Sequence, residues 1–208
     1  MEPLIVFLIV FVPMGWLMWR MLQSTRDSIG SRSPLKVNRV YETTAWSFFV
    51  SFESFYALHA LLFGGFSAYC VIFVRFATPN PELGRLLMSL LGLIVTGLGI
   101  MIVAVDLNHW KFARHITIET FPKEHELEVH LKDFTLRLKD GDIDRIVVYS
   151  NNTRLNLGFV SYYLANGGHF ALPFKTKGMR AIQEYFKNVR VEYRIQRIPL
   201  IPVTDRLD

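Results

Sequence analysis

Apolar residues follow two different patterns along the chain. Before Val105 they form long runs with few charges, and from Asp106 onward a charged residue appears every few positions. Three of the runs are long enough to cross the hydrocarbon core of a bilayer, which takes about 20 residues of helix. They cover about 4–22, 55–77 and 86–105. The pattern therefore predicts a transmembrane region over residues 1–110, made of three helices.

The first run has the features of a retained anchor rather than of a cleaved signal peptide. A signal peptide carries basic residues at its start and small residues at its cleavage site. This chain opens with Met-Glu-Pro, and the bulky Trp16, Met18 and Trp19 stand where small residues would be needed. We therefore expect this run to remain as a helix.

Basic residues mark one side of the predicted bundle. Five of them accompany a single acid, Asp27, between Arg20 and Arg39, and the third run is followed by Lys111 and Arg114. Loops rich in lysine and arginine stay in the cytoplasm. The charge bias predicts a multi-pass membrane protein, with its N-terminus outside and its C-terminal domain in the cytoplasm. In a bacterium, this membrane would be the cytoplasmic (inner) membrane.

Aromatic residues agree with this orientation. Amphipathic rings prefer the membrane–water interface, and the four tryptophans fall at helix ends assigned to the cytoplasmic face. They are Trp16, Trp19, Trp46 and Trp110. The aromatic stretch 43–54 either extends the second helix or lies along this interface, and the sequence leaves both open.

From His115 onward the apolar residues recur at every second position, which is typical of strands with one buried face. The segments with this pattern are about 116–118, 127–131, 134–138, 146–149, 159–165 and 169–174. The Asn166-Gly167-Gly168 stretch is typical of a hairpin turn. Residues 177–188 follow with one apolar helical face, and 189–198 form a last extended piece. These elements predict an α+β domain over 114–198, with a tail at 199–208.

This order of strands and helix, over about 115–188, resembles bacterial pleckstrin-homology-like (PH-like) domains, which often follow two or more membrane helices. The motifs that carry the resemblance are Ile116-Thr117-Ile118, Asp140-Gly141-Asp142-Ile143 leading into Arg145-Ile146-Val147-Val148-Tyr149, Gly167-Gly168, Leu172-Pro173-Phe174 and the terminal helix. The resemblance implies a small antiparallel β-barrel or sheet with a C-terminal helix. That fold has seven strands, whereas the pattern gives six. Such domains bind lipid headgroups, bind peptides or act as scaffolds, so the fold alone does not give the function.

Composition and motifs limit the partners and reactions that we expect for the chain. The chain has 23 basic and 18 acidic residues, for a net charge of +5, which fits cytoplasmic loops and anionic lipid. No nucleic-acid motif accompanies this charge, so we expect no nucleic-acid partner. Its one cysteine, Cys70, lies in an apolar run, and the chain has no nucleotide loop or nucleophile elbow. We expect no catalytic residues, no cofactor and no metal ligands.

Three basic residues form a candidate site in the soluble domain. Lys175, Lys177 and Arg180 lie where the last hairpin strand meets the helix. Beside a membrane, such a cluster can contact anionic lipid headgroups or a partner, with each cation contributing on the order of 1 kcal/mol. The alternative is ordinary solvated surface.

Two features of the second apolar run are further candidates. Ala60, Gly64 and Ala68 recur every four residues, and small residues allow helices to approach closely in lipid. They predict a packing interface, either with another subunit or with the other helices of this chain. His59 is an ionisable group inside the run and a candidate intramembrane polar site.

Three functions fit these observations. The first is a non-enzymatic membrane protein whose cytoplasmic PH-like domain binds protein or lipid as a scaffold or accessory. The second is a subunit of a larger transport or secretion complex, with other membrane subunits or copies of itself as partners. The third is an intramembrane enzyme or transporter that uses His59, which the lack of a carboxylate in mid-helix disfavours.

Overall fold

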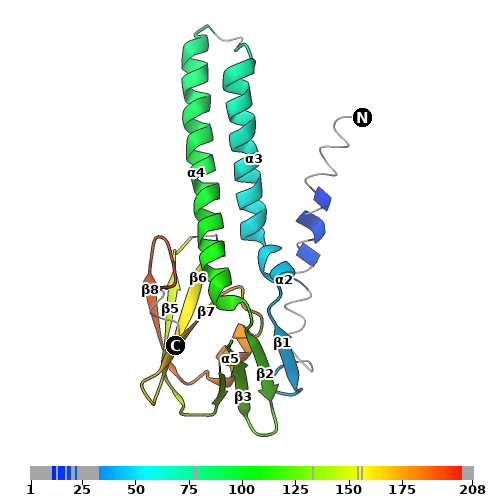
Figure 1. The fold of residues 1–208 in the computed structure, drawn as a ribbon, viewed down its shortest axis with the longest axis vertical. Coiled ribbons are helices and arrows are strands. Elements are labelled where there is room, and N and C mark those ends of the chain that lie inside the picture. The colour runs from blue at the N-terminus through cyan, green and yellow to red at the C-terminus, as the bar shows by residue number, and fades with distance from the viewer. Residues whose placement is uncertain are drawn as a thin grey trace.

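The protein consists of a long helical hairpin standing on a domain of two β-sheets (Figure 1). The computed structural model describes residues 11–12, 14–16, 18–19, 22, 33–76, 79–132, 134–153, 155 and 157–202. Most of the predicted first run, 4–22, lies outside the described residues. The expected combination of long apolar helices with an α+β domain is confirmed for the rest of the chain.

The hairpin is formed by α3 (Phe52–Phe73) and α4 (Pro81–Ala113), both long and apolar enough to cross a membrane. Each begins at a polar N-cap: Ser51 accepts a hydrogen bond from the backbone N–H of Ser54, and Asn80 accepts one from Leu83. A separate short helix, α2 (Ala45–Phe49), precedes α3. The stretch 43–54 is therefore not a continuous extension of the second helix.

Small residues bring α3 and α4 together. A side chain at Gly64 would collide with Thr96, whose hydroxyl donates a 2.6 Å hydrogen bond to the carbonyl of Gly92. A β-carbon at Gly92 would lie 2.7 Å from that of Ser67, which is too close for a real contact. The hairpin thus depends on glycines placed opposite side chains of the facing helix.

Eight strands form two sheets of four. The first sheet is antiparallel and has the order β1 (Arg39–Glu42), β2 (Thr117–Phe121), β3 (Glu126–His130), β4 (Thr135–Leu138). The second has the order β7 (His169–Pro173), β6 (Gly158–Leu164), β5 (Ile143–Ser150), β8 (Arg190–Ile195). Its only parallel pair among the described strands is β5 with β8. The six strands predicted from the alternating pattern are β2 to β7.

Strand β1 belongs to the sheet domain although it precedes the hairpin. It pairs antiparallel with β2, with Glu42 opposite Thr117. Only two residues separate β1 from α2, and three separate α4 from β2. The predicted division of the chain, with residues 1–110 as membrane region and the domain starting at 114, therefore leaves out one strand. Its two apolar residues, Val40 and Tyr41, are adjacent, so the segment shows no alternation that could be detected.

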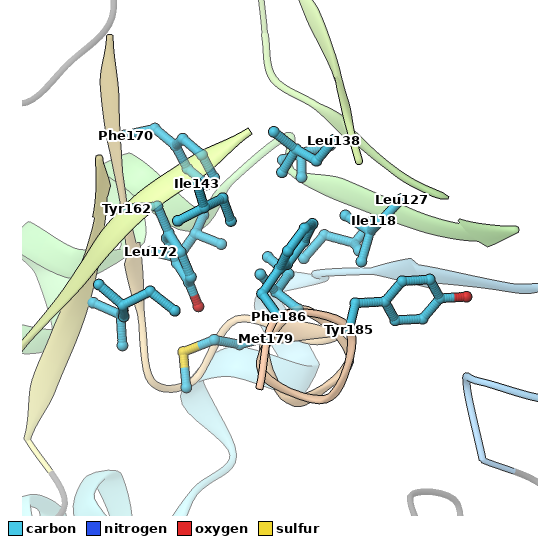
Figure 2. Packing of buried hydrophobic residues seen from close by; sticks show 14 of the residues in the cluster. Ile118, Leu127, Leu138, Ile143, Tyr162, Phe170, Leu172, Met179, Tyr185 and Phe186 are labelled. Atoms are coloured by element: carbon cyan, nitrogen blue, oxygen red, sulfur yellow. The ribbon is translucent and has the colours of Figure 1, made fainter. Parts of the chain in front are cut away.

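The core of the domain lies between the two sheets and is closed by α5 (Met179–Tyr185). In Figure 2, side chains of the first sheet face those of the second, and α5 lies against both sets. Labelled examples are Ile118, Leu127, Leu138, Ile143, Tyr162, Phe170, Leu172 and Met179. Burial of each large side chain contributes roughly 1.5–3 kcal/mol, so this core stabilises the domain by apolar contact.

Replacement of Gly64 should disrupt the hairpin. We expect Gly64→Leu to lower the free energy of unfolding by about 1–3 kcal/mol, because the new side chain would have to displace Thr96. Gly65→Leu is the matched control, since nothing lies within 4 Å of a β-carbon at that position. Thermal unfolding of the two detergent-solubilised variants measures the difference. Equal stability of both variants would contradict the packing described.

Candidate functional site

A cluster of buried charges joins the hairpin to the sheet domain. The ammonium of Lys175 lies 2.6 Å from Oδ1 of Asp106 and 3.6 Å from Oε2 of Glu53. The three side chains are 10%, 5% and 15% exposed, respectively. Charges this far from water occur in folded proteins only when they are paired.

Each member of the cluster comes from a different element. Glu53 lies in the first turn of α3, where the helix dipole favours a negative charge. Asp106 lies on α4, two turns before the end of the helix, and accepts a 3.0 Å hydrogen bond from the Ser54 hydroxyl. Lys175 lies two residues after the end of β7. The cluster therefore connects both helices to the second sheet.

Aromatic rings cover the cluster beside α2. Phe48 is fully buried, and its ring centre lies 5.6 Å from the Lys175 ammonium. Trp110 packs on the same ring at 5.3 Å. Trp46, also on α2, is 70% exposed, and its ring centre lies 6.4 Å from that of Trp16. The buried Phe48 ring excludes water from one side of the ion pairs, which strengthens them.

A second connection lies one turn further along α4. Nε2 of the buried His109 is 2.6 Å from the carbonyl oxygen of Pro199. The side-chain amide of Asn108 accepts a hydrogen bond from the backbone N–H of Ile201 and donates one to its carbonyl, at 2.8 and 3.3 Å. The described part of the predicted tail, 199–202, is thus held against α4.

The predicted basic cluster at Lys175, Lys177 and Arg180 is divided by the fold. Lys175 points into the ionic junction, whereas Lys177 and Arg180 are exposed. The backbone N–H of Lys177 bonds to the Thr43 hydroxyl at 3.1 Å, which ties this turn to the segment after β1. A buried, doubly paired lysine is not available to a headgroup, so the three do not form one surface site.

The candidate residues of α3 are also divided. Gly64 and Ala60 face α4, and the β-carbon of Ala60 would lie 3.0 Å from one added at Gly99. Ala68 is exposed, and the interface continues instead through the buried Ser67.

The environment of His59 lies within its own helix. Its Nδ1 is 2.9 Å from the carbonyl oxygen of Phe55, and its ring packs on the Phe55 ring at 4.0 Å. Within the described part of the chain, these contacts bring no second ionisable side chain to His59.

Sequence reasoning missed the roles of Asp106 and Glu53. Each is a single acid at the end of an apolar run. That position was the one feature of the sequence that could have pointed to their role. An acid in such a position usually marks where a membrane segment ends. Pairing with Lys175, 69 residues beyond Asp106, depends on the fold.

One group of side chains in the described residues has the geometry to hold a metal ion. The ligand atoms of Glu119, Glu128 and His130 lie within 4.8 Å of one another on the first sheet. Glu128 also faces Arg137, with Nε and Oε1 3.7 Å apart. Cross-strand charge pairing on a solvated face accounts for this arrangement.

The same sheet carries a ladder of charged side chains that lowers the pKa of one carboxyl group, that of Glu126. The Lys139 ammonium, 2.7 Å from Glu126, and the Arg137 guanidinium beside it hold the pKa of Glu126 below its usual range. Glu126 therefore remains ionised at neutral pH. The Arg137 and Lys139 side chains are more than half exposed, whereas that of Glu126 is 10% exposed.

Comparison of the chain with protein-family models, with curated proteins and with solved structures found no match.

Removal of the lysine tests the ionic junction. We expect Lys175→Met to lower the free energy of unfolding by about 3–5 kcal/mol, because it leaves two buried carboxylates without a counter-charge. The exposed Lys177→Met is the matched control and should change stability by less than about 0.5 kcal/mol. Denaturant unfolding of the purified full chain measures both.

A neutral version of the junction provides a further check. Glu53→Gln and Asp106→Asn, added to Lys175→Met, should recover much of the loss, since no unpaired charge then remains buried. A triple variant as unstable as Lys175→Met would mean that packing, not charge, determines the stability of this region.

Proposed function

We propose that α3 and α4 cross a membrane and anchor the sheet domain at its cytoplasmic face as a non-enzymatic interaction module. The observation that carries this proposal is the surface of the hairpin, which exposes large apolar side chains along its length. Examples are Leu62, Phe66 and Ile72 on α3 and Leu86, Leu93 and Ile100 on α4, all more than half exposed. In water each would cost roughly 1.5–3 kcal/mol relative to burial, and lipid removes that cost.

The lengths of the helices support the same arrangement. At 1.5 Å per residue, α3 is about 33 Å long and α4 about 50 Å, whereas the hydrocarbon core is about 30 Å thick. The last turns of α4, which carry Asp106 and His109, would then lie beyond the hydrocarbon. The buried ion pairs would lie in the headgroup region, where charged groups are tolerated.

The cytoplasmic placement of the domain follows from charge and aromatic positions. Lys111 and Arg114 flank the end of α4 next to the sheets, and basic flanks stay inside. Trp46 and Trp110 lie at the same end of the hairpin. The proposed location is the bacterial cytoplasmic membrane.

An interaction module is proposed because the domain is fixed relative to the membrane. The β1–β2 ladder, the Lys175 ion pairs and the His109 bond all join it to the hairpin. With β1, seven strands precede α5, the number of the PH-like fold, and this supports the resemblance. Domains of that kind present a rigid surface to lipid or protein.

A subunit role in a larger membrane complex is the second candidate. Gly65 and Ala68 on α3 and Gly97 on α4 face outward, and nothing lies within 4 Å of a β-carbon at either glycine. Small outward residues allow another helix to approach closely. Mild extraction followed by measurement of the particle mass separates the two candidates, since a complex would be much heavier than one chain.

Cysteine labelling tests the membrane crossing. In a Cys70→Ala background, Pro79→Cys at the tip of the hairpin should react with an impermeant maleimide in intact cells. Position 79 is preferable to Asn80, which caps α4. Asp140→Cys, on the far turn of the sheet domain, is 72% exposed as aspartate and should react only after lysis.

Each other outcome contradicts a defined part of the proposal. Reaction of Asp140→Cys alone in intact cells would reverse the orientation. Reaction of both variants, or of neither, in intact cells would place the two ends of the hairpin on one side and exclude a crossing.

A further inference from the structure

The edge strand β8 and the loop after it expose an apolar surface that the described part of the domain leaves uncovered. Tyr193 is 79% exposed and Ile195 74% exposed, although both lie in a strand. Ile198 and Leu200 in the following loop are 47% and 41% exposed. An apolar surface of this kind on a folded domain marks an interaction site.

Alternation along β8 separates apolar from polar side chains. Val191, Tyr193 and Ile195 lie on one face because successive side chains point to opposite faces. On the other face, Arg194 lies over the ring of Tyr149, and Glu192 pairs with arginines on both sides. The strand therefore presents one apolar face.

The loop after β8 is held at the end of the apolar part of α4. Its Pro199 accepts the hydrogen bond of His109, and Ile201 pairs with Asn108. Asn108 lies three residues beyond Val105, the last residue of the apolar run, which is about 4.5 Å along the helix. Ile198 and Leu200 are thus fixed near the level at which the hydrocarbon would end.

The neighbouring connection between β5 and β6 reaches the same level. Leu155 and Leu157 pack against Ile102 and Val105 of α4. The backbone N–H of Gln196 bonds to the carbonyl of Ser150 at the end of β5. Figure 1 shows both loops on the side of the sheets that faces the hairpin.

We propose that this edge of the domain inserts into the headgroup region of the leaflet beside the hairpin, binding anionic lipid. The proposed contact residues are Tyr193, Ile195, Arg197, Ile198 and Leu200. Apolar side chains enter the interface while Arg197 reaches phosphate oxygens, as in interfacial amphipathic segments. This proposal rests on the proposed function, because it requires α3 and α4 to cross the membrane.

Lipid fits this surface better than a protein partner does. The bonds of the loop to α4 set the position of this surface near the end of the apolar run. Leu107, the residue of α4 before Asn108, is itself 51% exposed. The exposed Arg197 adds positive charge, which complements the anionic cytoplasmic leaflet.

The test uses the full chain, reconstituted in vesicles of phosphatidylcholine with and without phosphatidylserine. An environment-sensitive fluorophore is attached at Ile198→Cys, in a Cys70→Ala background, and nitroxide lipids serve as the quencher. We expect this label to lose most of its emission to headgroup-level nitroxides. A label at Asp140→Cys, on the far turn of the domain, should lose almost none.

A further label separates the proposed lipid contact from the proposed membrane crossing on which it rests. A label at Leu93→Cys, on the exposed side of α4, reports the membrane crossing through nitroxides carried on the lipid acyl chains. Quenching at 93 without quenching at 198 would overturn the lipid contact and leave the crossing intact. No quenching at 93 would overturn the crossing, and with it this proposal.

Charge and partner are tested with the same samples. Phosphatidylserine should increase quenching at 198, and Arg197→Gln or added salt should remove the increase. Equal quenching in both vesicles would overturn the anionic preference. A label at 198 that neither a water-soluble quencher nor the nitroxide lipids can quench would indicate contact with a second copy, and would also overturn the proposal.

Discussion

The arrangement of the whole molecule depends on keeping one lysine and two carboxylates out of water at the junction. Asp106 and Glu53 come from the two helices and Lys175 from the second sheet, so the ion pairs form only when all three parts are in place. Desolvation of three charges is costly, and removal of one partner leaves that cost uncompensated. The cluster therefore contributes less to net stability than to the choice of one arrangement of the two helices and the second sheet.

Continuity of the backbone reinforces this condition. The strands that enter and leave the hairpin are hydrogen-bonded neighbours in one sheet. Long flexible linkers usually let a soluble domain move relative to its anchor. Here nine residues, which include α2, join β1 to α3, three residues join α4 to β2, and the His109 bond holds the segment after β8. These links restrict the movement of the sheet domain relative to the hairpin.

Only the features of the fold that depend on the pattern of neighbouring residues could be predicted from the sequence. The helices of the hairpin follow from apolar runs, and β2 to β7 follow from alternation, because both signals lie within a few residues. In β1 the two apolar residues are adjacent and give no periodic signal. The burial of Lys175 could not be predicted, since a lysine between threonine and phenylalanine resembles any surface lysine. Its partners are distant in sequence, and only the fold brings them close.

The position of β1 also has a consequence for how the chain is made. The ribosome produces β1 first, then both helices of the hairpin, and only afterwards its partner β2, so that Arg39 must find Thr120 across the entire hairpin. Closing so large a loop is entropically unfavourable for a free chain. Formation of α3 and α4 as a compact pair brings the two strands side by side. The first sheet is thus completed only after the hairpin has formed.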